Sequence, residues 1–258
     1  MKILFWNLKK NDLSNYIKDC LIENDIDIAI FCEKDNVDFY KLADEVNYEY
    51  IETIGGCRKI AFICKKSITV EIRAESTRYA IYQIDLDSKK YIIAGLHLED
   101  RRNYKKYRRM ETARNIIHDI SDIEIETNCK NTILIGDFNA NPWDEELLLT
   151  TSFNSVLFKE IIDKDETVEN DKTVYNRLYN PIINFLNEKD KTYGSFYYAD
   201  DSPSTIWHCL DQILLSKNLI NDIIDIKYLK IINGTSLIAQ IRPRNTISDH
   251  LPLLAKLK

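Results

Sequence analysis

Glycine and proline are scarce in this chain, which has only 6 glycines and 5 prolines among its 258 residues. The sequence also lacks internal repeats, low-complexity tracts and the Gly-, Ser- or Pro-rich stretches that form flexible linkers. Apolar residues make up 45% of the chain, which at this length is enough to bury one large core. We therefore expect residues 1–258 to fold as a single domain.

An excess of positive charge is also missing. The 35 Lys and Arg residues are outnumbered by 41 Asp and Glu residues, and the formal net charge is −6. A nucleic acid would therefore not be attracted to the molecule as a whole. Any nucleic-acid binding has to rely on a local basic cluster.

The six cysteines, at positions 20, 32, 57, 64, 129 and 209, include no C-x-x-C pair and no metal-ligand spacing. At this length an even number of cysteines does not indicate a disulfide framework, so we expect reduced thiols. The apolar run from Ile3 to Trp6 is too short for a signal sequence or a membrane span. These absences predict a cytoplasmic protein without a membrane anchor, and nothing in the sequence indicates an obligate protein partner.

Short apolar runs recur along the chain and predict buried β-strands. They are KILFW (2–6), IDIAIFC (26–32), KIAFIC (59–64), AIYQI (80–84), YIIAGL (91–96), NTILI (131–135), LDQILL (210–215) and LPLLAKL (251–257). Apolar residues at helical spacing predict two helices, near 12–24 and 103–122. Their expected buried faces are Leu13, Ile17, Cys20 and Leu21 in the first, and Tyr107, Met110, Ala113, Ile117 and Ile120 in the second. Many strands with few, long helices indicate a layered α/β domain.

Two shorter segments are predicted from local chemistry. Asn139 and Asn141 can cap a third helix, in which Pro142 suits the first turn and the acidic residues 144–146 suit the positive end of the helix dipole. The polar stretch 163–172 is expected to be a solvated loop.

Polar side chains occur where several of the predicted strands end. They are Asn7, Glu33, His97, Asp137 with Asn139, Asp211, and Asp249 with His250. Taken singly, each has an ordinary explanation as a turn residue, a solvated acid or a core histidine. Asp211 is the least ordinary, because a carboxylate between Leu210 and Ile213 on a buried strand must find a partner.

Taken together, these groups supply what phosphoryl chemistry needs. It requires a hard cation held by oxygen atoms, an activated water, and donors for the charge on the phosphate oxygens. Magnesium keeps several of its waters and takes only one or two protein carboxylates. Zinc would need more His or Cys ligands at close spacing, and the four histidines form no H-x-x-x-H pair.

The same residues carry a resemblance to the endonuclease/exonuclease/phosphatase superfamily, which includes deoxyribonuclease I, exonuclease III-type nucleases, inositol polyphosphate 5-phosphatases and neutral sphingomyelinases. The matching segments, in chain order, are KILFWNL, IAIFCEK, GLHLED, ILIGDFNANP, LDQILLS and SDHLPL. The most specific are G-D-F-N and, about a hundred residues later, S-D-H-x-P. Between 140 and 200 the resemblance is weak and says nothing about the substrate.

The resemblance implies a deoxyribonuclease I-like α/β fold, a four-layer sandwich of two mixed β-sheets flanked by helices, with one metal site at the open edge between the sheets. It implies that Glu33 binds Mg²⁺ or Mn²⁺, with Asn7 and Asp249 close by. Asp137 would orient or deprotonate the attacking water, and Asn139 would position it. His250, held by Asp211, would stabilise the transition state, and His97 would bind phosphate or assist the leaving oxygen.

The substrate is predicted less sharply. Between 101 and 114 lie seven basic residues and one acid, and Arg101, Lys105 and Arg109 would share one helix face and could track a nucleic-acid backbone. The alternative is a solvated face. Aromatic residues between 193 and 207 could stack on bases or pack in the core. No Trp- and Arg-rich segment typical of abasic-site nucleases precedes Asp211, which weakens a DNA-repair role.

The leading hypothesis is therefore a metal-dependent phosphodiesterase that acts as a nuclease on DNA or RNA. The enzymatic alternative is a phosphomonoesterase or phosphodiesterase for a small or lipid head-group phosphate. The third possibility is a catalytically silent binding module, against which the intact metal-binding and water-handling positions argue.

Overall fold

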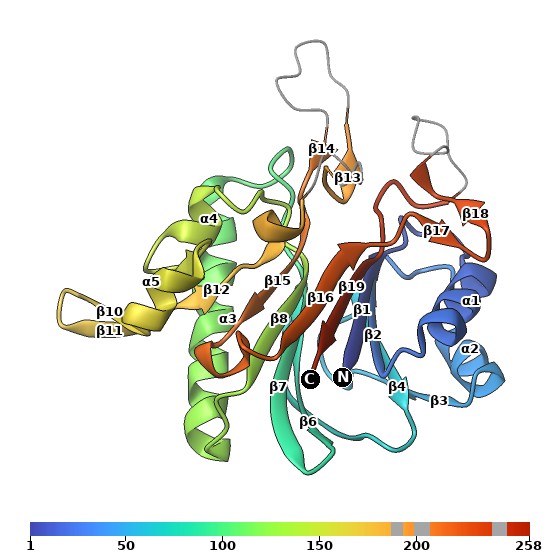
Figure 1. The fold of residues 1–258 in the computed structure, drawn as a ribbon, viewed down its shortest axis with the longest axis horizontal. Coiled ribbons are helices and arrows are strands. Elements are labelled where there is room, and N and C mark those ends of the chain that lie inside the picture. The colour runs from blue at the N-terminus through green and yellow to red at the C-terminus, as the bar shows by residue number, and fades with distance from the viewer. Residues whose placement is uncertain (187–192, 199–206, 239–246) are drawn as a thin grey trace.

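Two large mixed β-sheets pack face to face in the computed structural model, which describes residues 1–186, 193–198, 207–238 and 247–258 (Figure 1). The strands of the first sheet, in spatial order, are β16 (Ile223–Tyr228), β19 (Leu253–Leu257), β1 (Lys2–Asn7), β2 (Ile28–Cys32), β4 (Ile60–Lys65) and β3 (Tyr48–Ile51). Only β1 and β2 run parallel among these neighbours. The N-terminal and C-terminal strands therefore lie side by side in the middle of this sheet.

The second sheet has seven strands. In spatial order they are β5 (Thr69–Glu75), β6 (Tyr79–Leu86), β7 (Lys89–His97), β8 (Thr132–Asp137), β15 (Asp211–Leu215), β12 (Leu178–Tyr179) and β9 (Ser155–Val156). Strands β7 and β8 are parallel, as are β12 and β9, and the other pairs are antiparallel. Each of the eight apolar runs predicted as strands lies in one of the two sheets.

Helices cover the outer faces of both sheets (Figure 1). They are α1 (Ser14–Asn24) and α2 (Phe39–Glu45) on the first sheet, and α3 (Lys106–Thr127), α4 (Glu145–Leu148) and α5 (Lys159–Lys164) beside the second, with 3-10 turns at Ile182–Phe185 and Lys217–Leu219. The arrangement confirms the predicted four-layer sandwich. No helix in the described ranges is long and apolar enough to cross a membrane, and all six cysteines are free.

Burial on two faces explains why the central strands are almost continuously apolar. Strand β2 is buried at all five positions. Between the sheets, the Phe62 and Tyr82 rings lie with their centroids 4.2 Å apart. On the outer side of the second sheet, Ala113, Ile116 and Ile120 of α3 pack against it at helical spacing. The core thus has one layer between the sheets and another beneath α3.

The short ribbons lie at the periphery. They are the pairs β10 (Thr167–Asn170) with β11 (Thr173–Asn176), β13 (Phe196–Tyr197) with β14 (Trp207–His208), and β17 (Ile231–Ile232) with β18 (Thr235–Ser236). The first of these occupies the stretch predicted to be a loop, so that prediction was wrong. Asp171 and Lys172 both have positive φ, 49° and 66°, as the two-residue turn of a tight hairpin requires.

Two other local predictions need correction. Helix α4 begins at Glu145 after Asp144, so neither Asn139 nor Asn141 caps it. The side chain of Asn141 instead accepts a hydrogen bond from the backbone N–H of Cys209 at 3.0 Å. Tyr107, expected on the buried face of α3, is 68% exposed because the helix begins only at Lys106 and its first turn projects beyond the core.

Candidate active site

Three of the predicted polar residues form one row across the second sheet. In the β-ladder His97 pairs with Asp137, and Asp137 pairs with Asp211 on its other side. Gly136 precedes this row, and a Cβ there would lie 2.3 Å from the carbonyl oxygen of Leu96. Glycine is therefore required for β7 and β8 to approach closely at the position that orients Asp137.

Asn7 connects this row to the first sheet. It is the last residue of β1 and is 1% exposed. Its side-chain amide donates to Asp137 Oδ2 at 3.0 Å and lies 3.3 Å from Glu33 Oε1. The ends of β1, β2 and β8 thus meet at a common edge between the two sheets, as the resemblance implies.

Asp137 is a buried carboxylate with few donors. It accepts from Asn7 and from the backbone N–H of Asn139 at 2.9 Å. Burial raises the pKa of Asp137, and the nearby Asp211 charge raises it further, whereas His250 lowers it. A carboxylate in this environment is a stronger base than one in water.

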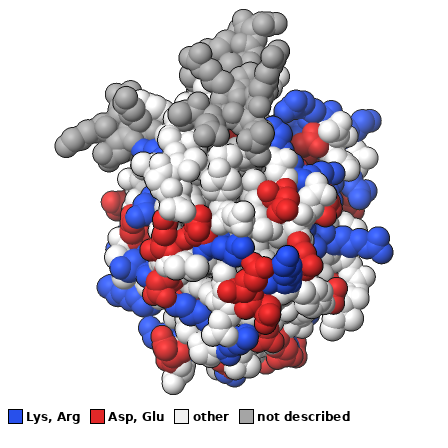
Figure 2. Space-filling view, turned by 90° about the vertical axis from the view of Figure 1, so that its right-hand side faces the viewer, with Lys and Arg blue, Asp and Glu red and all other residues white. Residues whose placement is uncertain are grey.

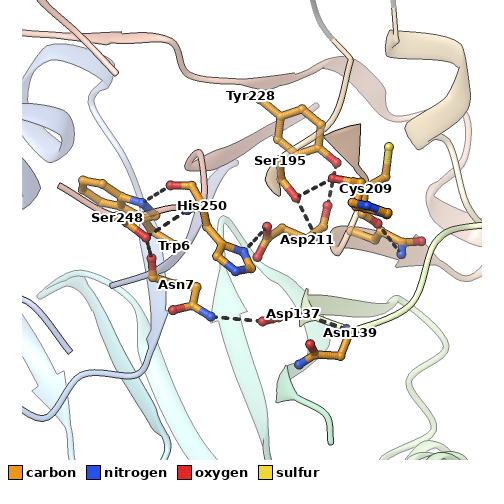
Figure 3. A network of polar contacts seen from close by, with 12 residues as sticks. Trp6, Asn7, Asp137, Asn139, Ser195, Cys209, Asp211, Tyr228, Ser248 and His250 are labelled. Atoms are coloured by element: carbon orange, nitrogen blue, oxygen red, sulfur yellow. Dashed lines mark hydrogen bonds and ion pairs between the residues drawn. The ribbon is translucent and has the colours of Figure 1, made fainter. Parts of the chain in front are cut away.

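His250 and Asp211 form the closest ionic pair of the site (Figure 3). His250 Nδ1 lies 2.7 Å from Asp211 Oδ2, and both residues are buried. The hydrogen bond predicted between them is therefore present. Burial alone would lower the pKa of His250, but the Asp211 charge and hydrogen bond raise it to about 10. The ring is thus a protonated donor at neutral pH, and Figure 3 shows it between Asp211 and the side chain of Asn7.

The backbone around His250 is fixed by residues to which the sequence analysis gave no role. Trp6 Nε1 donates to the carbonyl oxygen of His250 at 2.9 Å. Ser248 Oγ accepts from the His250 backbone N–H at 3.0 Å and donates to the carbonyl oxygen of Asn7. Both lie next to residues that the motifs identify, Trp6 before Asn7 and Ser248 within S-D-H, and that adjacency is the one signal that could have found them.

Hydrogen bonds with two other residues fix the backbone of Asp211 in the same way. Its backbone N–H donates to Ser195 Oγ at 3.0 Å, and its carbonyl accepts from the hydroxyl of Tyr228 at 2.7 Å. Its second carboxylate oxygen, Oδ1, is buried with no hydrogen-bond partner among the described residues. The Asp211 carboxylate therefore uses one oxygen, Oδ2, for its hydrogen bond with His250. Ser195 and Tyr228 lie outside every motif, so no sequence signal could have identified them.

The ring of His97 is buried beside two carboxylates. It is 8% exposed, and its Nε2 lies 3.6 Å from Glu33 and 3.9 Å from Asp137. Burial, followed by the charges of Lys59 and Arg78, lowers the pKa of His97 to about 3. The two histidines of the site therefore differ in charge at neutral pH, with His250 protonated and His97 not.

The acidic groups fit a divalent cation. Among the described residues neither Glu33 nor Asp137 forms an ion pair with Lys or Arg. The charge of Asp211 adds to the negative charge near Asp137. The side chain of Glu33 is 29% exposed, so it can be reached from solvent. Such a set of carboxylate and amide oxygens suits Mg²⁺ or Mn²⁺. Asp249, expected beside them, forms an ion pair with Lys9 at 2.8 Å.

The basic cluster does not form the expected face. Arg101 and Lys105 precede α3, and Arg101 is 2.5 Å from Asp144 and 3.1 Å from Glu146. Arg109 is 8% exposed and forms a buried ion pair with Glu146. Asp144 and Glu146 neutralise the charges of these two arginines. The ion pairs thereby join the α4 segment to the start of α3. Lys105 is exposed.

The chain was compared with protein-family sequence models, with curated proteins and with solved structures. The sequence model of the Endonuclease/Exonuclease/phosphatase family matches residues 3–250, whereas no curated protein matches the chain by sequence. Humanized D. rerio TDP2 aligns over 100% of this chain and 98% of its own, at TM-score 0.59 and 14% identity. The human Nocturnin catalytic domain aligns over 100% of this chain and 94% of its own, at TM-score 0.60 and 15% identity. An endonuclease/exonuclease/phosphatase family protein from Bacteroides thetaiotaomicron aligns over 100% of this chain and 97% of its own, at TM-score 0.61 and 15% identity. The chain belongs to the Endonuclease/Exonuclease/phosphatase family and is an enzyme of its class, a hydrolase of phosphoric esters.

Proposed function

We propose that this enzyme is a divalent-metal-dependent phosphodiesterase and that its substrate is DNA or RNA. The observation that carries the proposal is the meeting of Asp137, Asn7, Glu33 and the Asp211–His250 pair at one edge between the sheets. A base, a cation-binding carboxylate and a charged donor are then within reach of one phosphate.

Asp137 acts as the base in this proposal. Its carboxylate takes a proton from a water molecule as the water oxygen bonds to phosphorus and the bond to the leaving oxygen breaks. The raised pKa of Asp137 favours this transfer near neutral pH. Asn139, whose φ is 49° and whose amide donates to the Leu98 carbonyl at 2.9 Å, lies beside Asp137 and positions the water or a phosphate oxygen.

The two histidines take different roles because their charges differ. His250 is protonated and donates to the phosphate oxygens on which negative charge builds up. His97 is neutral, and it binds phosphate or assists the leaving oxygen. Asp211 does not touch the substrate but keeps the His250 ring oriented and charged.

Glu33 would hold the cation, with Asn7 beside it and Asp249 available if it leaves Lys9. When bound, a divalent cation supplies positive charge to the phosphate oxygens.

The test is a substrate panel of single- and double-stranded DNA, RNA, bis-p-nitrophenyl phosphate and inositol phosphates, run with Mg²⁺, Mn²⁺ or EDTA. We expect hydrolysis that EDTA abolishes and that Asp137→Asn lowers by a factor of about 10² to 10⁴. Asp122→Asn, on the exposed part of α3, is the matched control and should leave the rate unchanged. Absence of hydrolysis on every substrate would favour the silent binding module.

Similar structures support a nucleic-acid substrate. D. rerio TDP2 is complexed with single-strand DNA product, and the 3′ phosphatase NExo from Neisseria is bound to a product DNA hairpin. Figure 2 shows Lys and Arg interspersed with Asp and Glu on the face that carries α1 and α2, so that face offers no single-sign surface for a backbone. Lys105 and Arg102 are exposed, and Arg102 lies over the ring of Tyr198, so both can contact phosphates of a nucleic-acid backbone.

A small-substrate phosphatase is the second candidate, because Arg101 and Arg109 are already neutralised by acids. The double variant Arg102→Glu, Lys105→Glu distinguishes the two. A nucleic-acid enzyme should bind DNA or RNA more weakly in this variant, with a flatter salt dependence, and still hydrolyse the small diester. Lys41→Glu, on α2, is the control. An unchanged nuclease rate would favour the phosphatase.

A further inference from the structure

Cys32 lies at the proposed active site without a part in the proposed reaction. It is the last residue of β2, directly before Glu33, and it is fully buried. In the first sheet its Cα pairs with Asn7 on one side and Ile60 on the other. Its sulfur, one ring nitrogen of His97 and one carboxylate oxygen of Asp137 all lie within 4.8 Å of one another. A thiol, an imidazole and a carboxylate therefore converge from both sheets.

His97 supplies the second observation. It is more than nine-tenths buried, and its Nδ1 has no hydrogen-bond partner among the described residues. Its other nitrogen faces Glu33 and Asp137. The Nε2 contacts of 3.6 and 3.9 Å are longer than hydrogen bonds, so a cation bound to Nε2 would displace none.

We propose that Cys32, His97 and Asp137 form a binding site for a thiophilic divalent cation such as Zn²⁺ or Cd²⁺, with a sulfur and a nitrogen ligand that the oxygen ligands expected for Mg²⁺ do not include. Sulfur, nitrogen and oxygen ligands in a tetrahedral zinc site lie about 3.3 to 3.8 Å from one another, so closing the present spacing takes movements on the order of 1 Å. Mg²⁺ avoids thiolate ligands and would leave Cys32 untouched.

The thiol must lose its proton for this to occur. On binding, the sulfur–metal bond replaces the S–H bond and the proton passes to solvent. The cation then occupies Asp137 and His97, and the enzyme should be inhibited. This consequence for activity rests on the proposed function, whereas binding does not.

Binding is tested first by titrating the reduced, metal-free full-length protein with Cd²⁺ and recording the ultraviolet absorption of the cadmium–thiolate bond. We expect one equivalent to produce the band in the parent. Cys32→Ser should lose the band and bind more than about tenfold more weakly, because even residues behind the ligands contribute that much. Cys64→Ser is the matched control, since Cys64 is another fully buried strand cysteine, in β4 opposite Ile28.

An equal band in Cys32→Ser would overturn the site. Circular dichroism of each variant shows whether it has folded, and Cys32→Ala provides a second variant if serine is not tolerated. His97→Ala should retain the thiol and still bind more weakly, which a role for sulfur alone would not predict.

Inhibition is tested second, with Mg²⁺ and the best substrate of the panel. Zn²⁺ should inhibit the parent and Cys64→Ser, spare Cys32→Ser, and be reversed by chelation followed by Mg²⁺. Equal inhibition of Cys32→Ser would overturn the inhibitory role. If no substrate is hydrolysed at all, the proposed function fails while the Cd²⁺ titration still decides whether the site exists.

Discussion

Replacing Asp211 by Asn is the most informative single change, because it removes a charge and keeps the shape. Asp211 is fully buried and holds His250 at 2.7 Å. The rise of the His250 pKa from 6.5 to about 10 corresponds to on the order of 5 kcal/mol in favour of the protonated ring, as an upper bound. Without the Asp211 carboxylate, burial lowers the pKa of His250 against only the weaker effects of Asp137 and Asp249, so a smaller fraction of the ring is protonated at pH 7.

Activity should fall by a factor of about 10² to 10⁴ in Asp211→Asn and in His250→Ala, the usual range for one positioned donor. The double variant should be little slower than either single variant, because the two residues act as a unit. Steady-state rates of the four proteins measure this directly. Asn180→Ala, which removes a buried amide contact to Gln212 in the same sheet, controls for general loss of stability. Fully multiplicative losses would refute the reasoning.

Stability should show the same pairing as a pH dependence. The folded-state pKa of His250 is raised, so its contribution is fully present below pH 6.5 and is lost as the pH rises through about 10. Asp211→Asn should therefore lower the free energy of unfolding by roughly 3 to 5 kcal/mol at pH 6 and by less at pH 10. Urea denaturation at the two pH values checks this. A loss that does not depend on pH would leave Asp211 with a purely structural role.

Three further changes test other parts of the structure. Glu33→Gln should bind Mn²⁺ more weakly in calorimetric titration, because an amide lacks the carboxylate charge; equal affinity would remove Glu33 from the metal site. Arg109→Met should lower the free energy of unfolding by about 1 to 3 kcal/mol, since Glu146 loses one of its two arginine partners and keeps only Arg101; a neutral result in urea denaturation would contradict that pairing. Gly136→Ala should also destabilise the fold and slow hydrolysis, because its Cβ would meet the Leu96 backbone; unchanged rates would show that the edge can shift.

The strands and the two long helices could be predicted because burial on one or two faces imposes a repeating apolar pattern. The site residues could be predicted for a related reason. A polar residue next to an apolar run lies where a strand begins or ends: Asn7 and Asp137 are the last residues of β1 and β8, and Asp211 is the first residue of β15.

The parts that could not be predicted depend on contacts between distant segments. Arg109 was assigned to a solvated or phosphate-binding face, yet Glu146, 37 residues away, draws it into a buried pair. The spacing of residues within one helix does not indicate a partner that is distant in sequence. Likewise, Ser195 and Tyr228 contact Asp211 only through the folded backbone. The hairpin at 167–176 is different, because its Thr and Val residues on both sides of a two-residue turn did carry a signal.

The pairing of β1 with β19 has a consequence for the order of events during folding. These strands are more than 240 residues apart in sequence and adjacent in space, so the contact that joins them belongs to the slowest class of folding events. His250 lies a few residues before β19, so its ring reaches Asp211 of β15 only when the segment that leads into β19 is in place. We therefore expect the Asp211–His250 hydrogen bond to form late in folding.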